Sequence, residues 1–118
     1  MTKRKLFYLA PCALLLASTI TAQTGSTFTG EINDRACARA NSHDAMMKRH
    51  GSQNTKQCIL DCIKAGGKYV LVDDKTQAVY LLDDQQKPAQ FAGEKVTITG
   101  TLDKDSSTLH VADIQAAQ

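Results

Sequence analysis

The 118-residue sequence contains no tryptophan and only three tyrosines and three phenylalanines, and its formal net charge is only +2. Residues 1–22 hold three of the 14 basic residues and none of the 12 acidic ones, so residues 23–118 carry a formal charge of −1. Single-stranded nucleic acids are bound by aromatic side chains along a basic groove. The scarcity of both features argues against nucleic acid as a partner.

The sequence also lacks the short motifs of common enzymes. It has no phosphate-binding glycine loop, no zinc-protease helix motif and no Ser-His-Asp arrangement of recognisable spacing. The Cys-x-x-Cys of thioredoxin-like proteins and the Cys-x-x-Cys-His of c-type haem proteins are absent as well. The sequence therefore predicts a binding protein and not an enzyme.

Residues 1–22 predict a secretory signal peptide. Residues 3–5 are basic, residues 6–17 are apolar, and small residues lead to Ala22. This order is typical of a cleaved leader, and the apolar run is shorter than the ~20 residues that a membrane-spanning helix needs. We therefore expect a periplasmic or secreted protein with no membrane span after cleavage, and a single domain over residues 23–118.

Alternation of apolar and polar residues predicts five short strands. The expected strands cover residues 27–33, 69–73, 78–82, 96–102 and 109–114. A single helical turn is expected over residues 88–92, between the third and fourth strands. This order predicts an α+β, mainly β fold, a small OB-like five-stranded barrel that closes its edges on itself. A small open sheet with helices on one face is the alternative.

A helical insertion is expected between the first and second strands, over residues 35–67. Its first helix is expected over residues 44–50 and its second over residues 55–65. Asn54 or Thr55 is suited to cap the second helix, and the glycines at 66–67 are suited to end it. The insertion occupies a place where barrels of this kind often bind ligands.

The insertion concentrates soft and borderline metal ligands, namely Cys37, His43, Met46, Met47, His50, Cys58 and Cys62. Two cysteines four residues apart share one face of a helix, so both thiolates can reach one ion. A further cysteine and a histidine would complete a tetrahedral zinc site, whereas nearby thioethers would favour copper(I). The predicted zinc or copper ligands are Cys37, His43, Cys58 and Cys62.

A disulfide scaffold without metal is the alternative, because export favours oxidation of thiols. A bond from Cys37 to Cys58 or Cys62 would close a loop of about two dozen residues and stabilise a small domain by about 3 kcal/mol. A bond between Cys58 and Cys62 would need strained geometry along one helix. In this alternative the insertion contacts a protein partner in the cell envelope, and the odd cysteine allows a covalent dimer.

Five features occur together in this sequence: GEINDRAC at 30–37, His43, Cys58-x-x-x-Cys62 followed by Gly66-Gly67, KYVL at 68–71, and FAGEKVTITGTL at 91–102. In this combination the chain resembles a group of small secreted bacterial proteins of unknown function, which have an OB-fold-like β domain and a Cys/His-bearing insertion. The resemblance implies export and a small β domain. It implies no established activity.

Overall fold

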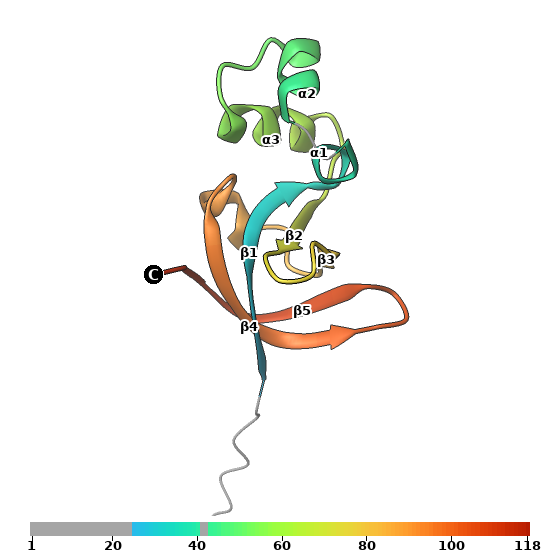
Figure 1. The fold of residues 1–118 in the computed structure, drawn as a ribbon, viewed down its shortest axis with the longest axis vertical. Helices are drawn as coiled ribbons and strands as arrows, with labels where there is room; N and C mark the ends of the chain where they lie inside the picture. Colours follow the sequence, from blue (N-terminus) through green and yellow to red (C-terminus); the bar gives the residue numbers. More distant parts are fainter. Residues whose placement is uncertain (1–24, 41–42) are drawn as a thin grey trace, which may run out of the picture.

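The computed structural model describes residues 25–40 and 43–118, and a mixed five-stranded sheet forms its centre (Figure 1). The strands are β1 (Ser26–Asp34), β2 (Tyr69–Asp73), β3 (Val79–Leu82), β4 (Lys95–Asp103) and β5 (Thr108–Ala116). They pair in the order β1-β2-β3-β5-β4, and β4 also pairs with β1, so the sheet closes into a barrel. Only the pair of β3 and β5 is parallel among the pairs of the described strands.

Three helices lie between β1 and β2, where the insertion was expected, and Figure 1 shows them gathered at one end of the sheet. They are α1 (Arg35–Ala40), α2 (His43–His50) and α3 (Thr55–Lys64). A 3-10 helix, η1 (Lys87–Phe91), joins β3 to β4. A backbone hydrogen bond joins the two ends of the insertion, because Arg35 N donates to Lys68 O at 3.0 Å.

The sequence predicts these elements well, with one exception and one range that the structure does not test. The five strands, α2, α3 and the helical turn lie within one to two residues of their expected ranges. The six-residue helix α1 was not expected. The predicted signal peptide, residues 1–22, lies outside the described residues. None of the helices in the described ranges is long and apolar enough to cross a membrane.

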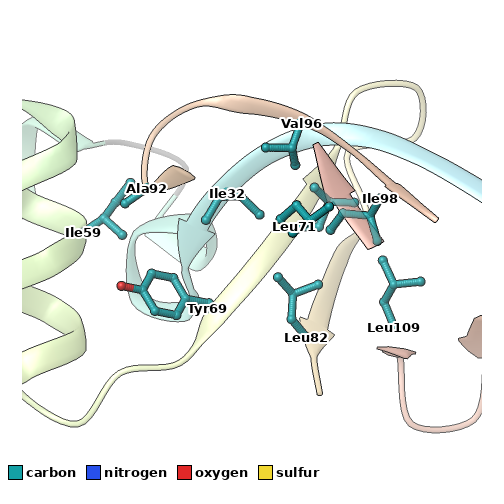
Figure 2. Packing of buried hydrophobic residues seen from close by; sticks show 10 residues of the cluster. Ile32, Ile59, Tyr69, Leu71, Leu82, Ala92, Val96, Ile98 and Leu109 are labelled. Carbon is teal, nitrogen blue, oxygen red and sulfur yellow. The ribbon is translucent and has the colours of Figure 1, made fainter. Parts of the chain in front are cut away.

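The main core fills the space inside the closed sheet and extends to one helix of the insertion (Figure 2). Its buried members are Ile32, Ile59, Tyr69, Leu71, Leu82, Ala92, Val96, Ile98, Leu109 and Ile114. Alternate residues of β1 and β4 point into it, which is the period-two pattern of a half-buried strand. Figure 2 shows Ile59 of α3 beside Ala92, so this side chain anchors the insertion to the barrel.

The turn after β2 depends on the carboxylate of Asp73, which is 8% exposed. Its Oδ1 accepts hydrogen bonds from the backbone N–H groups of Lys75 at 2.8 Å and Thr76 at 2.9 Å. The hydrogen bond from Thr76 is the main cause that holds the pKa of Asp73 below its usual range. A carboxylate that gains such bonds on folding stabilises the folded state only while it is ionised.

We expect Asp73→Ala to lower the free energy of unfolding by about 2 kcal/mol at neutral pH, since it removes the two hydrogen bonds from backbone N–H groups and a longer one from Thr76 Oγ1 at 3.2 Å. The folded-state pKa lies below that of the unfolded chain, so the contribution is complete above about pH 4. It is lost as the pH falls through the folded-state pKa. Urea unfolding of both proteins over a pH series measures this, and an equal difference at all pH values would contradict it.

Asp74→Ala is the matched control, because Asp74 is the next residue along and is also acidic. Its carboxylate is exposed and pairs with Lys95 Nζ at 3.1 Å. Exposed ion pairs contribute little to stability, so the control is expected to change the free energy of unfolding by less than about 1 kcal/mol.

Candidate metal site

Three cysteine side chains meet between α1 and α3. Cys37 comes from α1, Cys58 and Cys62 come from α3, and their exposed fractions are 2%, 0% and 5%. Met46 and Met47 of α2, which are half-buried, pack against them. We refer to these five residues as the sulfur cluster. It forms a small core of its own beside the main core of the barrel.

Helix α3 places two of the three thiols. Asn54 caps its first turn by accepting a hydrogen bond from Gln57 N at 2.8 Å, as its sequence position predicted. Cys58 and Cys62 lie four residues apart on one face, and Ile59 turns into the main core. The packing that anchors α3 to the barrel therefore also fixes the direction of its two cysteines.

Asp34 places the third thiol by capping α1. Its Oδ2 accepts a hydrogen bond from Ala36 N at 2.8 Å, and its Oδ1 accepts one from Cys37 N at 3.1 Å. Its own N–H donates to Asn33 Oδ1 at 2.8 Å. Asp34 and Cys37 are both almost completely buried, so the cap holds the Cys37 backbone at a defined place next to α3.

The sulfur atom of Cys37 is separated from each of the other two sulfur atoms by the distance expected for two ligands of one metal ion. Sγ of Cys37 lies 3.7 Å from Sγ of Cys58 and 3.9 Å from Sγ of Cys62. Both separations are longer than the ~2.05 Å of a disulfide bond, so these are thiols. Two thiolates bound tetrahedrally to zinc, each about 2.3 Å from the ion, have sulfur atoms about 3.8 Å apart. The observed separations fit this value.

His43, the first residue of α2, forms a group of three with Cys37 and Cys58. One ring nitrogen and the two sulfur atoms lie within 4.8 Å of one another. Nδ1 is buried and has no hydrogen-bond partner among the described residues. Nε2 lies 3.4 Å from Glu31 Oε1 and 3.4 Å from Asn33 Nδ2. An imidazole that binds a metal commonly uses one nitrogen for the ion and places the other beside a carboxylate. In His43 the nitrogen beside a carboxylate is Nε2, which leaves Nδ1 as the candidate for an ion.

Asp34 forms a second group of three with Cys37 and Cys62, again with donor atoms within 4.8 Å of one another. Burial raises the pKa of Cys37, and the hydrogen bond and negative charge of Asp34 raise it further. Burial and the charge of Asp34 also raise the pKa of Cys62. A protonated thiol is a poor nucleophile, which does not favour redox chemistry, whereas a bound cation favours the thiolate.

Each group of three adjoins an open pocket. The first pocket, of about 280 Å³, is lined by Cys37 and His43 together with Glu31, Asn33 and Lys95. The second, of about 320 Å³, is lined by Asp34, Cys62, Met46, Arg35, Arg39 and Lys68. Either pocket can admit water or a small ligand to a metal ion.

The structure brings the four ligands predicted from the sequence together, but it does not make them a single group. Cys37, His43 and Cys58 are mutually close, and Cys62 joins Cys37 in the group that contains Asp34. Asp34 was not among the ligands predicted from the sequence. Its signal was an aspartate directly before the short, alanine-containing segment RACARA, which is the position of an N-cap.

Glu31 was also missed, and the sequence gives it no distinctive signal, since it reads as one of the outward-facing polar residues of a strand. Its side chain is 33% exposed, yet its Oε1 atom is buried and has no hydrogen-bond partner among the described residues. The atom lies 3.4 Å from Nε2 of His43. This contact joins the first residue of α2 to a residue of β1 that is distant in the sequence, and no local pattern reveals it.

Residues 63–117 match the model of a family described as "Protein of unknown function (DUF5818)". The matched segment covers the last residues of α3 and strands β2 to β5, so it excludes all four predicted metal ligands. Neither a curated protein nor a solved structure matches the chain. The match agrees with the expected resemblance to proteins of unknown function, and it assigns no activity to the barrel.

Proposed function

We propose that this chain is an exported binding domain whose helical insertion holds a zinc or copper ion through Cys37, His43, Cys58 and Cys62. The observation that supports this best is the spacing of the thiols, 3.7 Å and 3.9 Å between sulfur atoms, beside a histidine whose Nδ1 has no hydrogen-bond partner in the described part of the chain. Three thiolates and one imidazole make a common zinc site. The two methionines that pack against the thiols support copper(I) as the other choice.

The OB-like character of the barrel is part of this proposal. The five strands close in the order β1-β2-β3-β5-β4, and a short helix joins the third strand to the fourth. OB-like barrels commonly bind ligands with the loop between their first two strands. Here the insertion takes the place of that loop, which supports a binding role for the insertion.

A disulfide-stabilised interaction module is the second candidate. The 3.7 Å and 3.9 Å separations also place Cys37 within easy reach of either partner for oxidation. Cys37 can bond to only one of them at a time, so one thiol remains in either case. This candidate predicts that cross-linking in the cell envelope repeatedly recovers one specific protein partner. Repeated recovery of none would count heavily against it.

The metal proposal is tested by titrating the reduced, metal-free protein with Zn²⁺ and, without oxygen, with copper(I), each against a competing chelator of known affinity. At least one equivalent of one metal is expected to be taken from the chelator. Thiolates must lose their protons to bind, so the titration should release protons at the same stoichiometry. If the chelator keeps both metals, the proposal fails.

Glu31→Gln is expected to weaken metal binding by about 10- to 100-fold, the usual cost of removing a carboxylate that orients a ligating histidine. The amide keeps the size of the side chain and removes its charge beside Nε2 of His43. The same chelator competition measures the change. The folded state, followed by circular dichroism, should be unaffected.

Glu94→Gln is the matched control for this substitution. Glu94 is also a glutamate close to a strand end, but it is exposed and does not line the pocket beside His43. The control should bind metal as the wild type does. Equal affinities for all three proteins would show that Glu31 does not orient His43.

A further inference from the structure

The structure contains two groups of possible metal ligands that share one thiol. The first group is Cys37, His43 and Cys58, and the second is Asp34, Cys37 and Cys62. In each group the donor atoms lie within 4.8 Å of one another. Thiolates can bridge two ions because sulfur has several lone pairs, so the shared cysteine does not restrict these two groups of ligands to one ion.

We propose that the insertion holds a second metal ion at Asp34, Cys37 and Cys62, with the Cys37 thiolate bridging it to the first. This inference rests on the proposed function and changes one of its ligands. Cys62, which the proposed function gives to the first ion, is here a ligand of the second ion. Cys37, His43 and Cys58 hold the first ion. Its fourth ligand is a water or small molecule in the pocket that Cys37 and His43 line.

Asp34 supports the second ion because its carboxylate is completely buried. Each of its oxygen atoms accepts one backbone hydrogen bond, from Ala36 N or Cys37 N. Since a carboxylate has about four acceptor positions, capacity for a cation remains. No ion pair among the described residues involves Asp34. A buried carboxylate is costly unless a cation or further hydrogen bonds compensate it.

The surroundings of the second group set its expected affinity. Arg35, Arg39 and Lys68 line the same pocket as Asp34 and Cys62. Their positive charges oppose a cation, although Arg39 and Lys68 are exposed and their effect is screened by solvent. The second ion should therefore bind more weakly than the first. The neighbouring pocket, of about 320 Å³, leaves space for a water or small anion as a further ligand.

The experiment is titration of the reduced full-length protein with an NMR-active isotope of Cd²⁺, a thiolate-binding probe for both sites. Two cadmium resonances are expected in sequence as metal is added, split by coupling through the shared sulfur. Cys62→Ser and Asp34→Asn should each lose the later resonance, whereas His43→Gln should lose the earlier one. Asparagine is also a good N-cap, but its single oxygen can accept only one of the two hydrogen bonds that Asp34 accepts, so circular dichroism must show that Asp34→Asn retains α1.

Each other outcome overturns the second site in a distinct way. A single resonance that Cys62→Ser weakens would show one ion and four ligands, which leaves the proposed function intact. Two resonances without mutual coupling, or a second resonance that survives both Cys62→Ser and Asp34→Asn, would place the second ion elsewhere. No resonance from bound cadmium would end both the second site and the proposed function.

Discussion

Cys37→Ser is expected to bind metal at least about 100-fold more weakly than the wild type, the largest effect of any single substitution in the site. The apparent free energy of zinc binding to structural sites is about 10–16 kcal/mol. Divided among four ligands, this is roughly 3 kcal/mol for each, which corresponds to a change of about 100-fold in Kd. Cys37 belongs to both groups of ligands and contacts both other thiols. Its loss therefore cannot be offset within either group.

The measurement is chelator competition, with circular dichroism in the absence of metal to show that the variant folds. Ala40→Ser is the matched control, because it introduces the same side chain at an exposed position of the same helix. The control should bind as the wild type does. If Cys37→Ser kept the wild-type affinity, the thiol spacing in the structure would have no connection with metal binding.

Ile59→Ala is expected to lower the free energy of unfolding by about 3 kcal/mol, within the range measured for large-to-small changes in protein cores. Ile59 is completely buried in the main core and comes from the helix that carries two of the thiols. The substitution should also loosen the insertion, because α3 then loses its main anchor to the barrel. Amide exchange in α3 should accelerate more than exchange in β4.

Urea unfolding with and without Zn²⁺ measures the effect on stability. Bound metal stabilises the folded state by about 2.7 kcal/mol at a free concentration of 100 times Kd, so zinc should restore much of the loss. Leu60→Ala is the control, since Leu60 is the next residue and is only half-buried. The control should lower the free energy of unfolding by less than Ile59→Ala does. An equal decrease for both variants would contradict the anchoring role of Ile59.

The strands and the last helix of the insertion could be predicted from the sequence because their signals are local. Alternation along Val96–Leu102 gives the inward face of β4, and Asn54 marks the start of α3. The four-residue spacing of Cys58 and Cys62 correctly placed both on one buried face. Each of these inferences needs only a few neighbouring residues.

The rest depends on contacts between distant segments. Helix α1 has six residues, too few for a periodic pattern, and short helices are stabilised mainly by packing. Without α1, the capping role of Asp34 and its approach to Cys62 cannot be inferred. The parallel pairing of β3 with β5 cannot be predicted from the sequence either. The alternation of apolar and polar residues shows that a strand is half-buried, but it does not show which strands lie beside it.

The most direct measurement is made on protein isolated from its native compartment without chelator, by elemental analysis and by intact mass after unfolding and thiol alkylation. For a chain without residues 1–22, we predict three alkylated thiols and at least one equivalent of zinc or copper. One alkylated thiol and no metal would contradict the metal site. That result would establish a disulfide scaffold with one spare cysteine, and the function should then be sought in a protein partner.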